Sequence, residues 1–435
     1  MPDKNIFCNT PWYELHIYWD GSLGICCQED HKLYQPSEKQ YNIATMSIAE
    51  WFNSQPVQNF RTGVNGDKRI SECRRCYMQE DHGGDSRRIR SNQKSVIYTH
   101  TAFADSLLQS PGYEHFQSSV TTTNPIDLHI DLGNFCNLAC KMCHPAASST
   151  IASQHVKWGI EQDRQYLGTD WTRNKTVWEN FKQQLLDLPN LNNIHFMGGE
   201  TLLTDRFEDL LDTMIQHSRF DLCFSFVTNG TVFKPALIDK LKLFRRVGLE
   251  ISIEALDAHN AYQRQGTDTQ LVLNNIDLYQ QWCNGSSITV SLRPAPSVLT
   301  IGYYTELLQY ALDKNFIVKS SLCVNPKFLY VGILTEDVRQ KYAKKYQEFL
   351  TQFDSLNTVP DYNSSDPNNY QQIIKHQAEM CMNLLLSPAV ADSAQLLEQM
   401  VRHCERWDRV YNLDARVLYP EWQEIFDRYN YDISS

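Results

Sequence analysis

The chain has 435 residues, of which 42% are hydrophobic, and a formal net charge of −11. No apolar run reaches the ~20 residues of a membrane span, and no signal-peptide stretch follows the first five residues, so we expect a cytoplasmic protein without a membrane partner. The acidic charge argues against general nucleic-acid binding. The 13 cysteines are clustered in a long chain, which favours metal binding over a small secreted disulfide scaffold.

Residues 1–100 are predicted to form a small α+β unit with a metal site. Segments 15–19 and 23–26 read as a β-hairpin that turns at Asp20-Gly21, and a short helix begins at Ile48. The hairpin brings two cysteines to one end of a small sheet, and a C-x2-C pair follows. The candidate ligands are Cys8, Cys26, Cys73 and Cys76, with Cys27 as a substitute for Cys26. This spacing suits a fully ligated iron–sulfur cluster and a structural zinc about equally.

Residues 101–125 are predicted to be a linker, within a longer connection over 82–125. The segment contains a helical pattern at 103–108 and ends at Asn124-Pro125. Arg87, Arg88 and Arg90 precede the linker. They are interpreted as a solvated basic turn, with binding of a phosphate or carboxylate as the alternative.

Residues 126–325 alternate short apolar runs with amphipathic segments, which predicts a parallel sheet with crossover helices. The expected strands are 126–132, 193–197, 223–228, 248–253, 287–292 and 317–324. The expected helices are 146–157, 174–187, 206–217, 235–244, 269–282 and 304–313. Six such units are too few for an eight-unit barrel, so the predicted fold class is α/β with an open, partial barrel.

A C-x3-C-x2-C triplet, Cys136, Cys140 and Cys143, follows the first of these strands. Three thiolates at this spacing can hold three corners of a cubane iron–sulfur cluster and leave the fourth iron to bind a small molecule. A zinc ion would want a fourth ligand, and the adjacent His144 is poorly placed to supply it. The triplet therefore predicts an open iron–sulfur cluster.

Polar residues also follow the next three strands, where parallel βα folds place their chemistry. These residues are Gly198, Gly199 and Glu200, then Thr228, Asn229 and Gly230, then Ser252 and Glu254. The glycines allow close approach of a ligand, and the Glu200 carboxylate can accept hydrogen bonds from an ammonium group. Ser252 and Glu254 point to the same side of their strand. Arg264 is a candidate to bind a carboxylate, with a surface role as the alternative.

These motifs resemble the radical S-adenosylmethionine (SAM) superfamily, whose core is a partial (β/α)6 barrel. The resemblance implies that Cys136, Cys140 and Cys143 bind a [4Fe-4S] cluster, with Met142 where an aromatic residue is common. It further implies that SAM is bound by Gly198, Gly199, Glu200, Thr228, Asn229, Ser252 and Arg264.

The first hundred residues resemble the twitch or SPASM domains that carry auxiliary clusters. The resemblance rests on Cys8, Pro11-Trp12, Gly21 with Cys26, and the Cys73/Cys76 pair. It implies an auxiliary [4Fe-4S] cluster on Cys8, Cys26, Cys73 and Cys76. There are cysteines for one such cluster, which favours the twitch form. In relatives this domain usually follows the core, whereas here it precedes the core.

Residues 326–435 are predicted to be a helical extension. Helical periodicity covers 336–355, 367–386 and 392–408, and Pro420 opens a short helix. The extension shows no ligand spacing, so packing on the open side of the barrel is expected.

The function expected from the resemblance is that of a radical SAM enzyme. An external one-electron donor reduces the cluster, SAM is cleaved to a 5′-deoxyadenosyl radical, and this radical abstracts hydrogen from a substrate, with a peptide or protein expected by analogy. The alternative is an iron–sulfur electron carrier that does not turn SAM over. Glu254, Tyr262 and Arg293 lie on plausible active-site rims, but no spacing singles out one of them as a catalytic acid or base.

Overall fold

The computed structural model describes residues 6–29, 41–81, 86–94, 124–168, 170–353 and 367–434. Its main strands are β1 (Glu14–Ile17), β2 (Leu23–Gly24), β3 (Asp127–Asp131), β5 (Asn193–Met197), β6 (Cys223–Thr228), β7 (Arg246–Ile251), β9 (Ile288–Leu292) and β10 (Ile317–Val318). They form one sheet in the order β10-β9-β7-β6-β5-β3-β1-β2. All neighbours pair in parallel except β1 and β2. The α/β class and the six predicted strands of 126–325 are confirmed, although β10 is shorter than expected.

Helices connect these strands and extend the chain beyond them. Those up to β10 are α1 (Ile48–Phe52), α2 (Gln55–Val64), α3 (Arg74–Asp81), α4 (Arg87–Lys94), α6 (Ser149–Lys157), α7 (Lys175–Leu186), α8 (Asp205–Gln216), α9 (Pro235–Leu241), α10 (Ala258–Gln263), α11 (Thr269–Cys283) and α12 (Tyr304–Asp313). After β10 come α13 (Glu336–Leu350), α14 (Pro367–Leu386), α15 (Ser393–Tyr411), α16 (Ala415–Leu418) and α17 (Gln423–Arg428). None of the described helices combines the length and the apolar character needed to cross a membrane.

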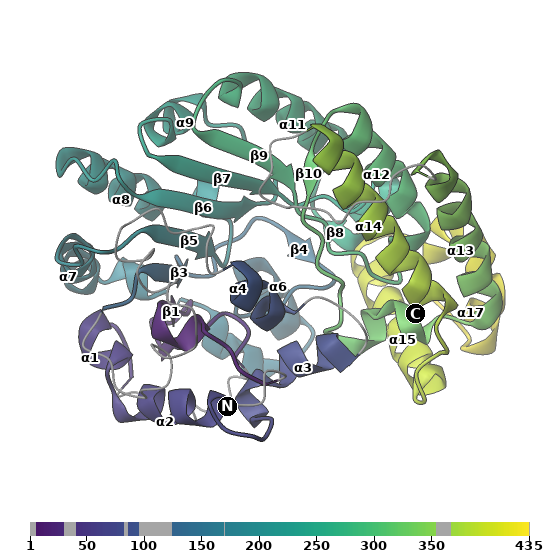
Figure 1. Ribbon diagram of the computed structural model, residues 1–435. Helices are drawn as coiled ribbons and strands as arrows, with labels where there is room; N and C mark the ends of the chain where they lie inside the picture. The colour runs from purple at the N-terminus through teal and green to yellow at the C-terminus, as the bar shows by residue number, and fades with distance from the viewer. Residues whose placement is uncertain are drawn as a thin grey trace.

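The crossover helices form because their apolar residues recur at helical spacing. In α7 the Asn174 side chain caps the first turn by accepting from the N–H groups of Thr176 and Val177. Trp178 and Phe181 then lie on the same side of the helix and are fully buried. Helices α7, α8, α9 and α11 follow the outer side of the sheet in this way (Figure 1).

The sheet has one apolar face and one polar face. Leu128 and Ile130 of β3 are buried in the hydrophobic core, whereas His129 between them points to the other face. The strand register aligns His129 with His16 on one side and with His195 on the other. The polar face is therefore the inner wall of the fold, and it is available for ligand binding.

The N-terminal hairpin belongs to the same sheet as the core. β1 and β2 pair antiparallel as predicted, but β1 also pairs in parallel with β3, so that Ile17 lies opposite Ile130. The expected small separate sheet is therefore wrong: the hairpin forms one edge of the main sheet. The predicted helical pattern at 103–108 lies outside the described residues.

The expected solvated basic turn at Arg87, Arg88 and Arg90 is also wrong. These residues lie on helix α4, where Arg88 is buried and donates to both carboxylate oxygens of Glu80. Arg87 donates to the buried carboxylate of Glu14 on β1. Both guanidinium groups find carboxylates within the chain, which compensates the cost of burying their charge.

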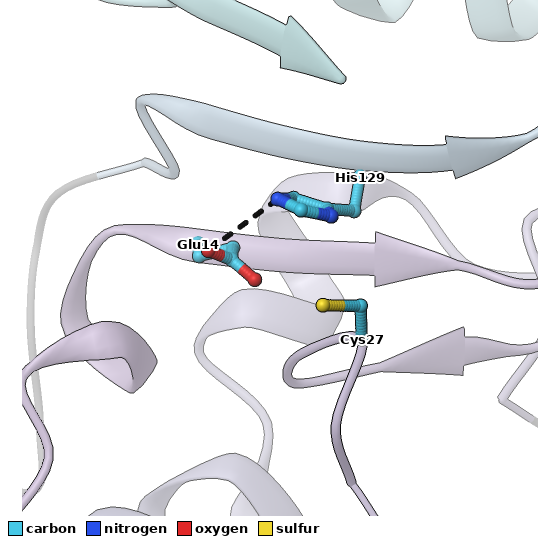
Figure 2. A group of neighbouring side chains, drawn as sticks. All are labelled: Glu14, Cys27 and His129. Atoms are coloured by element: carbon cyan, nitrogen blue, oxygen red, sulfur yellow. Dashed lines mark ion pairs between the residues drawn. The ribbon is translucent and has the colours of Figure 1, made fainter. Parts of the chain in front are cut away.

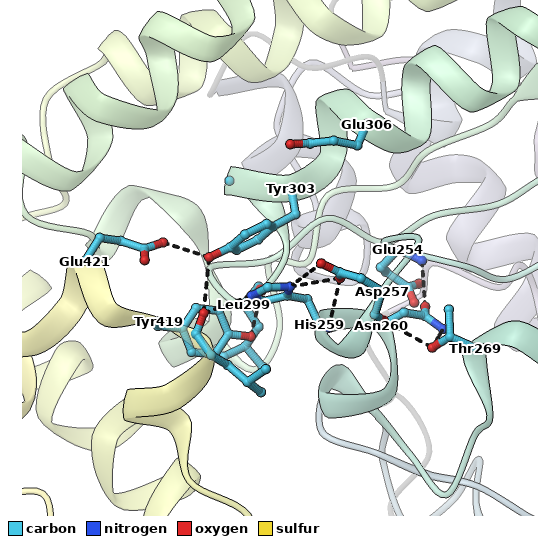
Figure 3. Close-up of polar contacts among 12 residues, drawn as sticks. Glu254, Asp257, His259, Asn260, Thr269, Leu299, Tyr303, Glu306, Tyr419 and Glu421 are labelled. Carbon is cyan, nitrogen blue, oxygen red and sulfur yellow. Dashed lines mark hydrogen bonds and ion pairs between the residues drawn. The ribbon is translucent and has the colours of Figure 1, made fainter.

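The C-terminal helices form an extension in which α14 packs beside β10 (Figure 1). Tyr303 connects this extension to the core, because its hydroxyl donates to Glu421 and its ring stacks on His259 at a centroid distance of 3.4 Å. Figure 3 shows this contact.

We predict that Ile17→Ala lowers the stability of the whole core by roughly 2–5 kcal/mol. Ile17 is fully buried and its strand is hydrogen-bonded to β3, so the cavity forms inside the shared sheet. The urea midpoint of unfolding, measured by far-ultraviolet circular dichroism, should decrease. Unfolding should remain a single transition. Val417→Ala, at a position that is 77% exposed, should change stability by less than about 0.5 kcal/mol. A separate early transition with an unchanged main midpoint would contradict the shared-sheet interpretation.

Candidate functional site

The loop after β3 carries Cys136, Cys140 and Cys143. Cys140 lies on the short strand β4 (Ala139–Cys140), which pairs antiparallel with β8 (Arg264–Gln265). The Thr150 hydroxyl at the start of α6 donates to the carbonyl of Cys136 at 2.6 Å. Neighbouring elements therefore hold the loop at both ends.

The sulfur atoms of this loop face hydrogen-bond donors. The Leu138 N–H donates to Cys136 Sγ at 3.5 Å, and Arg264 Nη1 donates to Cys140 Sγ at 3.7 Å. Burial raises the pKa of the Cys136 thiol to about 11 and the Leu138 N–H opposes this rise, whereas the nearby Cys143 adds to it. The donors would stabilise thiolate ligands in an otherwise desolvated loop.

The spacing of the cysteine sulfurs suits a cluster better than a single ion. A zinc ion bound at about 2.3 Å would hold its sulfur ligands roughly 3.8 Å apart. Among the described residues, no three cysteine sulfurs lie within 4.8 Å of one another. The three thiols of the loop nevertheless influence each other's pKa. They are thus grouped, but more widely than one zinc ion requires, and this fits a polynuclear iron–sulfur cluster.

Glu200 joins the predicted sites at the ends of β5 and β6. Its Oε1 accepts from the Thr228 hydroxyl at 2.7 Å and from the Leu202 N–H at 3.1 Å, and its Oε2 accepts from the Asn229 N–H at 2.6 Å. Burial raises the pKa of Glu200, and these hydrogen bonds oppose the rise. A carboxylate has about four acceptor positions, so three internal donors leave room for one more.

The glycine pair before Glu200 lies directly against the cysteine loop. Gly198 and Gly199 have φ angles of +75° and +56°, which favour glycine. A Cβ atom on Gly199 would lie 2.4 Å from the carbonyl oxygen of Phe135. The N–H of Glu200 donates to that same oxygen at 2.7 Å. The backbone at the end of β5 is thus fixed beside Cys136.

Ser252 and Glu254 follow the end of β7, and Arg264 lies on β8. The Ser252 N–H donates to the Thr228 carbonyl at 2.9 Å, which keeps these two strand ends adjacent. Arg264 is buried and donates to both oxygens of Glu254, so the surface alternative for Arg264 is wrong. Its partner is a carboxylate of the chain itself. The Glu254 N–H donates to Asn260 Oδ1 at 3.0 Å (Figure 3).

The N-terminal cysteines gather around helix α3. The thiols of Cys8 and Cys76 both influence the pKa of Cys73, and Cys73 influences that of Cys26. Burial is the main cause of the raised pKa in each case, and it brings the pKa of Cys8 to about 11. These four candidate ligands are therefore neighbours.

Cys27 points to a different group of residues. Its sulfur lies with a carboxylate oxygen of Glu14 and a ring nitrogen of His129, and all three atoms are within 4.8 Å of one another (Figure 2). Arg87 Nη2 donates to Glu14 and lies 3.1 Å from His129 Nε2. Because the Arg87 guanidinium already contacts both Glu14 and His129, the group is unsuited to a metal cation.

The inner face of the sheet borders a cavity of about 1280 Å³. Its lining includes Met142 from the three-cysteine loop and Met197, which directly precedes Gly198. It also includes Cys27, next to Cys26. The cavity therefore borders the segments that carry both cysteine sites, although none of the candidate cluster ligands is among its described lining residues. A volume above the roughly 300–1,000 Å³ of small-molecule sites suits a large ligand.

Helix α15 contributes contacts to the cysteine loop that the sequence did not reveal. Trp407 is buried against Ala139, and Cys143 packs beside it. Lys141 Nζ lies 5.3 Å from the Trp407 ring and 3.6 Å from the Tyr262 ring, a cation–π arrangement. The sequence signal for this contact was an aromatic residue on an amphipathic helix. Packing in the hydrophobic core explains such a residue equally well.

We predict that Gly199→Ala disrupts this site more than Gly159→Ala does. Both glycines have positive φ angles, but a Cβ atom at Gly159 meets nothing within 4 Å. Gly159→Ala should therefore cost only the roughly 1–2 kcal/mol of a left-handed alanine. Gly199→Ala adds a clash with the Phe135 carbonyl, so urea unfolding should show a larger loss. Equal losses for the two variants would contradict the tight contact between β5 and the loop.

Comparisons with known proteins give matches for two parts of the chain. The family model of the Radical SAM superfamily matches residues 130–290, and that of the SPASM iron–sulfur cluster-binding domain matches residues 8–77. A curated relative is the radical SAM cyclopropyl synthase TigE of Paramaledivibacter caminithermalis, which is 22% identical over 225 residues. That match covers 51% of this chain and 46% of TigE, so the chain spans about half the length of this relative.

Solved structures also show partial similarity. Native anSMEcpe with bound AdoMet and Cp18Cys peptide is 19% identical, with a TM-score of 0.38 over 53% of this chain and 60% of that one. Streptococcus suis SuiB bound to the precursor peptide SuiA is 11% identical, with a TM-score of 0.35 over 68% of this chain and 63% of that one.

Proposed function

Since this chain belongs to the radical SAM enzymes through residues 130–290 and carries an iron–sulfur cluster-binding domain in residues 8–77, we propose that it cleaves SAM reductively and acts on a peptide or protein substrate. An external one-electron donor would supply the electron. The core domain implies a [4Fe-4S] cluster and SAM as cofactors, and the N-terminal domain implies an auxiliary cluster.

The hydrogen bonds of Glu200 are the observation that carries this proposal. They join Thr228 and Asn229 to the Gly198-Gly199 backbone, which itself lies against the cysteine loop. Polar groups from successive strand ends are thereby held beside the three thiols. A cofactor that binds an open iron and also carries an ammonium and a carboxylate group would find acceptors and donors within this region.

Each part of the site has a role in the proposal. Cys136, Cys140 and Cys143 would hold the cluster. When bound, the reduced cluster supplies the electron that cleaves SAM to a 5′-deoxyadenosyl radical, which abstracts hydrogen from the substrate. The remaining acceptor position of Glu200 would bind the ammonium group of SAM.

The other residues would orient the cofactor and exclude water. Thr228, Asn229 and Ser252 would line the SAM site. Arg264 would act through its contact with Cys140, since its guanidinium group lies beside that sulfur. The six parallel strands β3, β5, β6, β7, β9 and β10 would form the partial (β/α)6 barrel that presents these groups.

The proposed domain boundaries separate the auxiliary-cluster site from the SAM site. We assign residues 1–100 to a twitch-like unit that holds one auxiliary cluster on Cys8, Cys26, Cys73 and Cys76. Residues 101–125 would be the linker, residues 126–325 the core, and residues 326–435 the helical extension. The large cavity that borders the segments carrying both cysteine sites supports a peptide-sized substrate between the two clusters.

We expect reconstituted, dithionite-reduced protein to form 5′-deoxyadenosine from SAM under anaerobic conditions. Cys140→Ala should reduce this product to the level seen without protein, because the cluster loses a ligand. Cys283→Ala, which alters a buried cysteine of α11 outside both sites, should leave the yield unchanged. Liquid chromatography measures the product. If cluster-replete protein forms none, the proposed function is wrong and an electron carrier without SAM turnover is favoured.

Metal analysis tests the auxiliary site separately. Reconstituted protein should contain about eight irons per chain, as two cubanes require. The double variant Cys73→Ala/Cys76→Ala should contain about four irons and should still bind SAM at the core site. A content of about four irons and one zinc in the unmodified protein would show that the N-terminal site holds zinc instead.

A further inference from the structure

The charge of the cavity is opposite to that of the chain. Eight Arg or Lys residues but only four Asp or Glu residues line it, whereas the chain carries a formal net charge of −11. A concave site whose lining has one predominant sign attracts ligands of the other sign. The lining therefore favours an anionic ligand even though the molecule as a whole repels one.

Three charged side chains form a cluster on the wall made by β7, β9 and β10. Glu250 of β7 accepts from Arg293 Nη1 at 2.5 Å and from Lys319 Nζ at 2.7 Å. Arg293 and Lys319 directly follow β9 and β10. Burial by itself would raise the pKa of Glu250, but the two cations lower it well below its ordinary value. One carboxylate between two cations leaves one positive charge uncompensated.

All three residues line the cavity, but the two cations are more exposed than the carboxylate. The side chains of Arg293 and Lys319 are 31% and 28% exposed, and that of Glu250 is 7% exposed. An arginine has five N–H donors and a lysine has three, and each side chain uses one for Glu250 among its described contacts. Further donors are therefore available to a ligand, and Glu250 holds the two cations in place.

This cluster faces the wall that carries Cys27 and His129. Arg293 is close enough to influence the pKa of both residues. Between the two walls lies His195, whose pKa burial lowers to about 3, so it is uncharged at neutral pH. Met142 of the three-cysteine loop lines the same space. A group bound at Arg293 and Lys319 would thus lie inside the cavity that borders the segments carrying both cysteine sites.

We propose that Arg293 and Lys319 anchor an acidic group of the substrate peptide, a carboxylate or a phosphate, within this cavity. The inference rests on the peptide substrate proposed above and names its chemical class. Glu250 is a positioning residue, because it orients the two cations without itself touching the ligand.

The test measures binding of labelled peptides to the reconstituted full-length protein by fluorescence anisotropy. Three peptides of the same length differ at one position, which is glutamate, phosphoserine or glutamine. At least one acidic peptide should bind about tenfold more tightly than the glutamine peptide, as expected for charge-assisted hydrogen bonds. Whichever acidic peptide binds with the higher affinity shows whether the anchor prefers a carboxylate or a phosphate. Equal affinity for all three overturns the proposal.

Two variants of the charged cluster should change the affinity for the acidic peptides in opposite directions. The triple variant Glu250→Gln/Arg293→Gln/Lys319→Gln removes the excess charge without leaving a buried carboxylate unpaired, and it should abolish the preference for the acidic peptides. Glu250→Gln alone removes the internal anion but keeps an amide oxygen that can accept from the cations. It should therefore tighten the binding of the acidic peptides severalfold, a gain that misfolding cannot produce. An unchanged preference in the triple variant overturns the proposal.

A control variant and a parallel assay complete the design. Lys314→Gln removes a lysine that pairs with Asp277 and does not line the cavity, so the peptide preference should persist. SAM cleavage is measured on the same preparations without peptide. If cleavage is absent while charge-dependent peptide binding persists, the proposed function fails and the anchor stands. If cleavage occurs without a preference for acidic peptides, only the anchor fails.

Discussion

The parallel pairing of β1 with β3 is the contact on which the arrangement of both cysteine sites depends. It places the N-terminal hairpin at the edge of the core sheet, with Glu14 and His16 in register with Asp127 and His129. Because β1 continues the polar inner face, the turn that carries Cys26 and Cys27 borders the same cavity as the three-cysteine loop. The N-terminal hairpin, which precedes the core in the chain, is thereby brought to the polar inner face of the sheet.

The inner face imposes a second constraint, because its buried charges need partners. Glu14 is paired with Arg87 from α4, Glu250 with Arg293 and Lys319, and Glu254 with Arg264. Each pair joins elements that are not adjacent in the chain. Losing one partner would leave a charge buried and uncompensated, which is strongly destabilising. Arg87 and the Glu250, Arg293 and Lys319 group also line the cavity, so these ion pairs contribute to its charge.

Local sequence patterns predicted the core well and failed where a partner lies far along the chain. The ranges expected for β5 and β6 agree with the structure, since their period and their flanking turns are local. Arg87 was interpreted as solvated because its partner, Glu14, lies 73 residues away. The contact of Trp407 with the cysteine loop joins positions more than 260 residues apart, and no spacing rule reports such a contact.

The sequence by itself determined the cofactor class, the α/β alternation and the order of polar residues at the strand ends. Those features depend on residue type and on short spacings along the chain, and both can be read from the sequence alone. Only the tertiary structure decided that β1 joins the core sheet, that Cys27 lies with Glu14 and His129, and that the cavity is basic in an acidic chain. These features depend on which faces of distant elements meet, and packing of the whole chain settles that choice.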